Sequence, residues 1–243
     1  MSLLADLRTM KAMVRGRGDE AAPLKDRLER FYADQAEDYD RFRERMLHGR
    51  DELIALLPSP PGARLVEFGG GTGRNLERFG SRLNRFADVE LVDLCPSLLS
   101  VARRRCARLG WSNVRCVEAD VTAYQASSPV DVLYCSYSLS MVPDWRRAID
   151  AALAALAPGG VLGVVDFFVS EADPPPGRAR HSAWSRWFWP RWFAHDGVAV
   201  HSEHLAYLAS RTIRLSLWEG TGPLPYLCAR VPYYVYVGRK PPV

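Results

Sequence analysis

A glycine-rich loop constrains the fold of this chain more than any other feature. The apolar residues 63–68 predict a short buried strand, residues 69–73 read Gly-Gly-Gly-Thr-Gly, and a helical pattern begins at Asn75. Glycines permit a tight turn and allow the backbone to approach a ligand closely. The sequence therefore predicts a strand, a ligand-binding turn and the start of a helix.

The spacing of this loop indicates which nucleoside it binds. A dinucleotide fingerprint needs a third glycine where this chain has Arg74, and a pyrophosphate would be repelled by the neighbouring Glu67. The same carboxylate suits a ligand that carries an amino group and a sulfonium. Asp93 ends the next apolar segment, about 20 residues on, where a carboxylate can accept both ribose hydroxyls. S-adenosylmethionine is therefore favoured over NAD, the alternative being a purely structural turn.

Apolar segments alternate with helical patterns through the middle of the chain. Such alternation predicts parallel strands joined by crossover helices, with ligands at the carboxyl ends of the strands. The predicted strands are 63–68, 89–93, 114–118, 130–136 and 161–168, and the predicted helices are near 73–80, 96–109 and 144–156. We expect a single domain with three regions: a helical cap over 1–58, the cofactor-binding core over 59–170, and an aromatic-rich insertion with two closing strands, 213–218 and 231–237, over 171–243.

Polar residues follow three of the later predicted strands. Asp120 and Val121 follow the third strand, Ser136 and Tyr137 end the fourth, and Asp166 lies near the end of the fifth. Each acid taken alone is more often a helix cap or a turn residue. Their regular placement at successive strand ends favours a binding site.

At this point the chain resembles the class I S-adenosylmethionine-dependent methyltransferases, whose core motifs correspond to residues 60–168. The resemblance implies an α/β, Rossmann-like sheet of seven strands with helices on both faces, one of the last two strands being antiparallel. An N-terminal helical extension and an aromatic-rich C-terminal insertion would be added to it. It also implies roles for named residues: Glu67, Gly69, Gly71 and Gly73 around the methionine part, Asp93 at the ribose, Asp120 and Val121 at the adenine, and Ser136 beside the sulfonium.

A narrower resemblance extends outside these core motifs. The segments 39–43 with 48–50, 136–143, 165–170 and 222–226 look like the N-methyltransferase of betaine-lipid synthesis. That family methylates diacylglyceryl-homoserine three times, which would make the enzyme that produces this lipid a possible partner. Tyr39 would close over the cofactor, although it could equally be a core residue.

Methylation of an amine requires an unprotonated lone pair in line with the sulfur, and therefore a base. His195 and Tyr137 are the candidate bases, and Arg43 or Arg50 could hold the substrate carboxylate in a bidentate pair. A turn histidine, a core tyrosine and solvated arginines are the structural alternatives. The reaction requires no metal.

The aromatic segment 184–193 is the strongest sign of a lipid substrate, because tryptophan and arginine suit a membrane boundary. A lid packed on the sheet is the alternative. A net charge of +4 does not call for a nucleic-acid partner, five cysteines without a C-x-x-C pair indicate reduced thiols, and no apolar run spans a bilayer. We expect a cytoplasmic protein, peripheral at the inner membrane surface. The alternatives are a methyltransferase for a soluble small molecule or quinone, and a non-catalytic adaptor that binds the cofactor.

Overall fold

The computed structural model describes residues 23–32, 44–194, 197–224 and 229–242. Seven strands form one mixed sheet in the order β3-β2-β1-β4-β5-β7-β6. Strands β1 to β5 are parallel, and β7 is antiparallel to both of its neighbours. The strands are β1 (Arg64–Phe68), β2 (Asp88–Asp93), β3 (Val114–Glu118), β4 (Val130–Ser136), β5 (Leu156–Phe167), β6 (Ile213–Pro223) and β7 (Arg230–Arg239). This confirms the predicted sheet, including its antiparallel closing strand.

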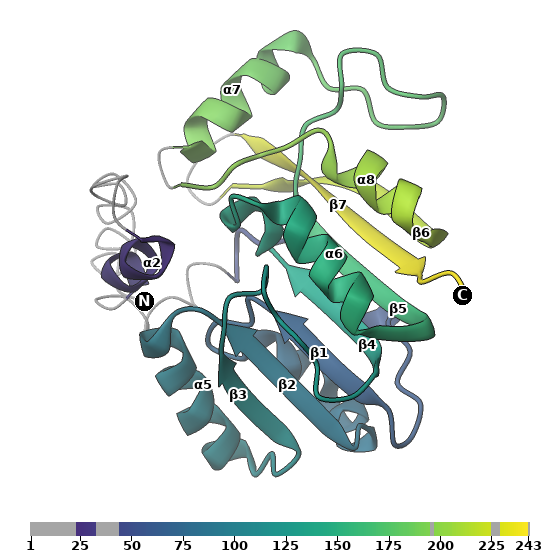
Figure 1. The fold of residues 1–243 in the computed structure, drawn as a ribbon. Helices are drawn as coiled ribbons and strands as arrows, with labels where there is room; N and C mark the ends of the chain where they lie inside the picture. Colours follow the sequence, from purple (N-terminus) through teal and green to yellow (C-terminus); the bar gives the residue numbers. More distant parts are fainter. Residues whose placement is uncertain (1–22, 33–43, 195–196, 225–228, 243) are drawn as a thin grey trace.

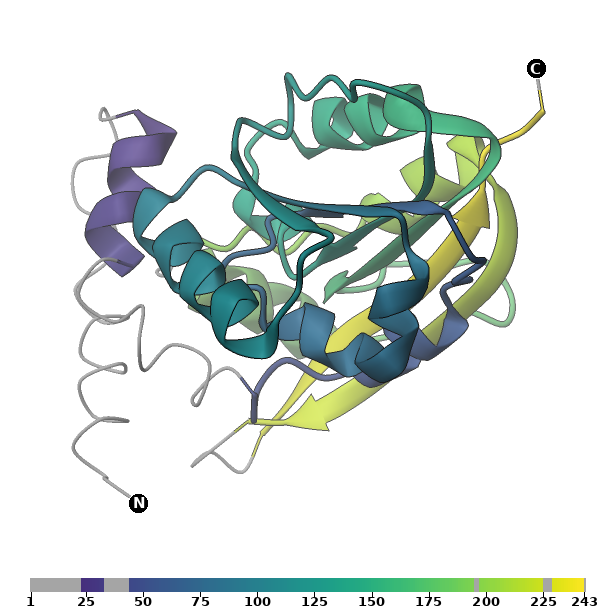
Figure 2. The ribbon, with the colours of Figure 1, turned by 90° about the horizontal axis from the view of Figure 1, so that it is seen from below.

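Helices cover both faces of the sheet (Figures 1 and 2). Consecutive strand residues point to opposite faces, so Leu65 and Val66 belong to different core clusters. On the face of Leu65 lie α4 (Arg50–Leu56), the 3-10 segment η1 (Arg74–Arg85) and α5 (Pro96–Leu109). On the face of Val66 lie α6 (Trp145–Ala155) and α8 (His204–Arg211). The strands are therefore apolar on both sides, as buried parallel strands require.

Three boundaries differ from the sequence prediction. The helix expected near 73–80 is the longer segment η1, which kinks where Gly80 leaves helical geometry. Strand β5 begins earlier than predicted, at Leu156. This residue precedes the Pro-Gly-Gly turn and already pairs with Val130 of β4. Strand β6 extends to Pro223 because β7 pairs with it along its full length.

Two further helices lie outside the layers that cover the sheet. The helix α2 (Leu24–Tyr32) packs its Leu28 and Tyr32 against the start of α5, and α7 (Ala183–Ala194), at the top of the view in Figure 1, reaches the core on the face of Leu65 through its buried Trp189 and Phe193. A short 3-10 turn, η2 (Leu139–Met141), connects β4 to α6. Among the described residues, no helix has the length and apolar character needed to cross a bilayer.

Candidate active site

The glycine loop follows β1, and its backbone is hydrogen-bonded to the end of β2. The amides of Gly69 and Gly70 both donate to the carbonyl of Val92, at 2.8 and 3.1 Å. Gly69 has φ +66°, and a Cβ at this position would lie 2.4 Å from the Cβ of Ser138. Only glycine fits a loop that is both left-handed and in contact with the end of β4. The loop backbone thus forms one wall of a cavity at the carboxyl ends of the strands.

Asp93, at the end of β2, fixes the position of this wall. One of its carboxylate oxygens accepts the amide of Gly71 at 2.8 Å, and the other accepts the amide of Cys95 at 2.8 Å. Burial raises the pKa of Asp93, while these backbone donors act in the opposite direction. The carboxylate lines the cavity, and each of its oxygens retains a second lone pair for a ligand hydroxyl.

Glu67 lies behind the wall rather than in it. Its side chain is fully buried, and one oxygen accepts the amide of Asn75 at 2.8 Å. The oxygen of Asn75 in turn accepts from Arg50 at 3.4 Å, and both Asn75 and Arg50 line the cavity. Burial raises the pKa of Glu67 to about 7. The prediction that Glu67 lies directly around the ligand is corrected: the carboxylate is placed to act through Asn75.

The end of β4 supplies the opposite wall. Ser136 is buried, and its hydroxyl has no hydrogen-bond partner in the described part of the chain. Tyr137 has φ +54°, a strained value for a residue with a side chain, and its hydroxyl donates to the carbonyl of His48 at 2.6 Å. Burial raises the pKa of Tyr137 well above its ordinary value. A neutral phenol that donates its proton to a carbonyl does not act as a base, which argues against the predicted catalytic role.

The third strand contributes a smaller part of the cavity. Val121 is buried, whereas Asp120 is exposed, and one oxygen of Asp120 accepts both the amide and the hydroxyl of Thr122 at 2.8 Å. Both residues line the cavity, and the adenine-binding role implied for them stays a prediction.

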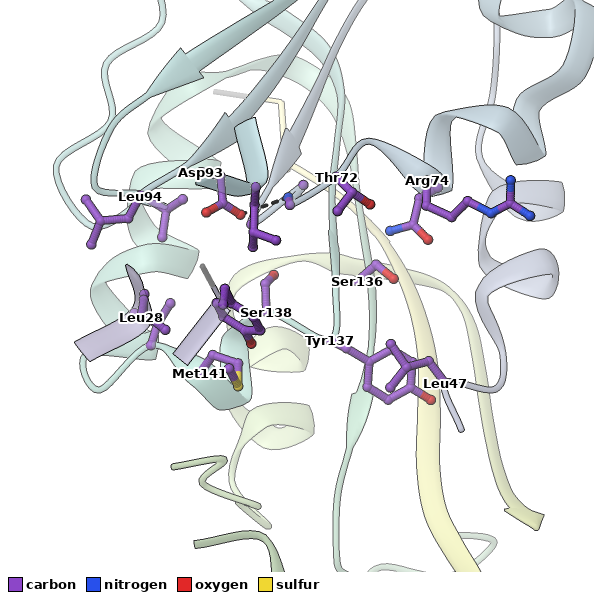
Figure 3. Close-up of a pocket in the computed structure, with 18 of the residues that line it drawn as sticks. Leu28, Leu47, Thr72, Arg74, Asp93, Leu94, Ser136, Tyr137, Ser138 and Met141 are labelled. Carbon is purple, nitrogen blue, oxygen red and sulfur yellow. Dashed lines mark hydrogen bonds between the residues drawn. The ribbon is translucent and has the colours of Figure 1, made fainter. Parts of the chain in front are cut away.

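The cavity contains about 950 Å³ of empty space, part of it open to solvent. Figure 3 shows that residues from widely separated segments face it, with Thr72 and Asp93 on one side and Ser136, Tyr137 and Leu47 on another. Leu24, Leu28 and Tyr32 of α2 cover it from outside the core. A concave site lined by apolar side chains and a few polar groups is typical of a small ligand or cofactor site.

Several sequence predictions lie elsewhere. Tyr39, Arg43 and His195 are outside the described residues. Gly73 begins η1 but does not line the cavity. Asp166 serves the fold, because its oxygens accept the amide and hydroxyl of Ser140 and its own neighbour's amide. The described residues contain no group of three or more metal-ligating side chains.

Sequence reasoning missed Asn75, Thr72, Leu94 and Met141, which all line the cavity. Asn75 and Thr72 are polar residues next to the glycines, so proximity to the motif could have identified them. Leu94 follows Asp93 directly and could have been found in the same way. Met141 and the residues of α2 reach the cavity only through the tertiary fold.

The donor set fits S-adenosylmethionine. Asp93 offers acceptors for a ribose diol, and glycine at position 69 lets the loop backbone that lines the cavity pack directly against Ser138. Asn75 and Arg50 offer polar groups to an amino-acid tail, and the unpartnered hydroxyl of Ser136 faces the same cavity.

Comparisons with known proteins agree with this fit. A family model described as a methyltransferase domain matches residues 38–222. The trans-aconitate 2-methyltransferase of Rhizobium leguminosarum bv. trifolii is 25% identical over 217 residues, 79% of this chain and 81% of that protein. The protein of the same name from Variovorax paradoxus is 35% identical over 130 residues, 52% of this chain and 47% of that protein, about half of its length. These names differ from that of the betaine-lipid enzyme.

Solved structures share the fold. Phosphoethanolamine N-methyltransferase 2 of Haemonchus contortus, in complex with S-adenosyl-L-methionine, superposes with a TM-score of 0.69 at 15% identity, covering 91% of this chain and 61% of that chain. Since the family model spans more than half of the 243 residues and the cavity fits the cofactor, the chain belongs to the methyltransferase domain family and is an S-adenosylmethionine-dependent methyltransferase.

Proposed function

We propose that the acceptor is a small soluble carboxylic acid with two or more carboxylates, methylated on a carboxylate oxygen. The observation that carries the proposal is the alignment along most of both chains with a relative named trans-aconitate 2-methyltransferase. The cavity is compatible with such an acceptor, because Arg74 and Ser136 are among the residues that line it. This replaces a lipid amine as the main hypothesis.

The chemistry of a carboxylate also suits the groups at the end of β4. A carboxylate is already ionised at neutral pH, so it needs positioning and no general base. The hydroxyl of Tyr137 donates to a carbonyl, and that of Ser138 donates to the carbonyl of Phe68 at 2.8 Å. Neither hydroxyl is arranged to remove a proton from an ammonium group.

When bound, S-adenosylmethionine supplies an electrophilic methyl group. Asp93 and the glycine loop would hold the nucleoside, and Asn75 with Arg50 would hold the amino-acid tail. We therefore reassign Arg50 from the acceptor carboxylate to the cofactor, because Arg50 hydrogen-bonds with Asn75, which in turn binds Glu67. Arg74, whose side chain is 39% exposed against 6% for Arg50 and pairs with Glu44 and Glu77, is then the cation of the described lining that we assign to the acceptor.

The test is a labelling assay with methyl-labelled S-adenosylmethionine and a panel of di- and tricarboxylic acids that includes trans-aconitate. We expect label in a methyl ester, which mild alkali releases as methanol. An N-methyl group survives the same treatment, so the assay separates oxygen from nitrogen methylation. Cofactor binding by calorimetry without ester formation would exclude this acceptor class and retain the methyltransferase assignment.

A second candidate is the three-step N-methylation of diacylglyceryl-homoserine. It is favoured by the exposed tryptophans Trp184, Trp187 and Trp192 of α7, which would suit an enzyme working on a lipid. The enzyme that makes the homoserine lipid would then be a partner. Alkali-stable label in the lipid fraction of mixed micelles, in the same assay, would establish this candidate in place of the first.

A further inference from the structure

The helix α7 is anchored to the core by one of its faces. Trp189 and Phe193 are each 3% exposed, and the ring of Phe193 stacks on that of Phe167, with centroids 4.4 Å apart. Phe167 in turn packs against Tyr137, with centroids 4.5 Å apart. A continuous row of aromatic rings therefore connects the inner face of α7 to the wall of the active-site cavity, which fixes how the helix is oriented.

The outer face of α7 presents large aromatic side chains to solvent. Trp184, Trp187 and Trp192 are 61, 54 and 43% exposed, which is unusual for residues of this size on a soluble surface. Trp184 stacks on Phe188 with centroids 4.4 Å apart and an interplanar angle of 11°. At 100° per residue, these four side chains fall on one side of the helix, opposite Trp189 and Phe193. The helix thus has an apolar inner face and an aromatic outer face.

The charged side chains in the stretch of sequence that contains this outer face are all positive. Residues 177–194 contain four arginines and no acidic residue. Arg191 donates to the carbonyl of Trp187 at 3.0 Å, and its guanidinium lies 4.9 Å from the centre of the Trp187 ring. The ion pairs of Arg178 and Arg180 are with Glu219 and Asp173, outside this stretch. Tryptophans with an arginine held among them match an interface of apolar chains and anionic headgroups.

We infer that the outer face of α7 is a docking surface for an anionic lipid bilayer. The helix would lie in the plane of the interface, with Trp184, Trp187 and Trp192 inserted at the level of the headgroups and Arg191 against lipid phosphate. The inference does not rest on the proposed acceptor, because attachment through α7 is compatible with a soluble or a lipid substrate. One aromatic ring, that of Phe167, then lies between Phe193 of the docked helix and Tyr137 in the cavity wall.

The test is co-sedimentation of the full chain with sucrose-loaded vesicles of phosphatidylcholine alone or with phosphatidylglycerol. We expect binding to the anionic vesicles and a loss of about tenfold or more in the partition coefficient for the triple variant Trp184→Ala, Trp187→Ala, Trp192→Ala. The matched control is Trp218→Ala, since Trp218 is 45% exposed but lies on β6. Calorimetry with S-adenosylhomocysteine checks that each variant is folded.

A single substitution separates the contribution of the arginine to membrane binding from that of the tryptophans. Arg191→Gln should reduce the preference for phosphatidylglycerol while retaining the blue shift of tryptophan fluorescence on binding. The inference is overturned if the wild type stays in the supernatant, or if the triple variant sediments as well as the wild type, which would assign binding to another segment. It is also overturned if the wild type forms dimers that the triple variant does not form, because the occupant would then be a second copy of the chain.

Discussion

The two sides of the cavity are built by different means. The cofactor side is formed by one stretch of chain, residues 67–75, together with Asp93, and its contacts are mainly backbone hydrogen bonds. The other side, which we propose receives the acceptor, includes Tyr137 directly after β4, and Tyr137 is held by His48 before α4, which in turn contacts Pro223 at the end of β6. His48 accepts from Tyr137 across 89 positions of sequence and contacts Pro223 across 175.

Because of this difference, we expect the two sides of the cavity to tolerate substitutions unequally. Backbone shape on the cofactor side depends on residues without a side chain, so a single added carbon disrupts it. The acceptor side depends on side-chain contacts, which can adjust by rotation and small shifts. We therefore expect substitutions on the cofactor side to abolish binding and those on the acceptor side to reduce it gradually, which also allows acceptors to differ among proteins that share the fold.

The largest expected effect comes from Gly69→Ala. The new methyl group would lie 2.4 Å from Ser138 at a residue with φ +66°, so the loop must move away from the end of β4. We expect S-adenosylhomocysteine affinity to fall by about 100-fold or more, since clash and backbone strain together exceed about 3 kcal/mol. Calorimetric titration measures this.

The control for that variant is Gly62→Ala, which has φ +79° but nothing within 4 Å of the added carbon. It carries the backbone strain without the clash and should bind the cofactor normally, with a loss of about 1 to 2 kcal/mol in stability. Equal binding losses in the two variants would show that the close packing of Gly69 on Ser138 is unimportant.

Glu67→Gln tests the buried charge behind the cofactor side. Burial raises the pKa of Glu67 from an ordinary 4.5 to about 7, so between these pH values the folded chain keeps a proton that the unfolded chain releases. Stability of the wild type then decreases as pH rises through this window, and the variant lacks this contribution. We expect the variant to gain up to about 3 kcal/mol relative to the wild type between pH 4.5 and 7.

Urea unfolding of both proteins without cofactor across pH 4.5 to 7.5 gives this difference. The neighbouring buried acids, Asp93 and Asp166, are present in both proteins. Their contributions to the pH dependence of stability therefore cancel to first order in the difference. Asn75, Tyr134 and Arg50, which also contribute to the pKa of Glu67, are unchanged. A stability difference that is constant with pH would mean that Glu67 has the same pKa in the folded and in the unfolded chain.

The contrast between the two sides also explains what the sequence could predict. The seven strands, which the structure confirms, follow from local apolar runs. The residues proposed for the cofactor come from equally local signals: a glycine loop after the first strand, and strand ends for Asp93, Val121 and Ser136, which all line the cavity. Each of these signals lies within a few residues of its own strand, so no knowledge of tertiary contacts is needed.

The acceptor side could not be predicted in this way. Nothing local to His48 indicates that its carbonyl meets Tyr137, and the strand-end rule that found Asp93 also selected Asp166, whose oxygens serve the fold. Arg50 was predicted to hold an acceptor, whereas we propose that it serves the cofactor, because it hydrogen-bonds with Asn75. Residue type suggested the chemistry, and only the tertiary fold assigns each group to a side.

Gly222→Ala probes the acceptor side with the smallest possible change. A Cβ at Gly222 would overlap the ring of His48, 1.8 Å from its Cδ2, and would displace the contact between this ring and the carbonyl of Pro223. We expect KM for the methyl acceptor to rise by about tenfold, roughly 1.4 kcal/mol, with cofactor affinity nearly unchanged. Steady-state kinetics and calorimetry measure the two quantities.

The matched control lies two residues earlier on the same strand. At Gly220 the nearest atoms to an added carbon belong to the ring of Trp218, 3.1 Å away, and this exposed side chain can move aside. Gly220→Ala should therefore leave KM within about twofold of the wild type. A loss of cofactor binding in Gly222→Ala would show that the two sides of the cavity are not separable.

The smallest expected effect is that of Tyr137→Phe, and it tests the role of this residue most directly. The variant leaves the part-buried carbonyl of His48 without its donor, which should cost about 1 kcal/mol of stability and change kcat by less than tenfold. The shape of the pH–rate profile should stay the same, because burial raises the pKa of the phenol far above the working range. A general base would behave differently: its removal should lower kcat by about 100-fold or more and abolish the ionisation from the profile. Comparing the pH–rate profiles of the two proteins therefore decides whether Tyr137 holds the backbone at His48 in place or takes part in proton transfer.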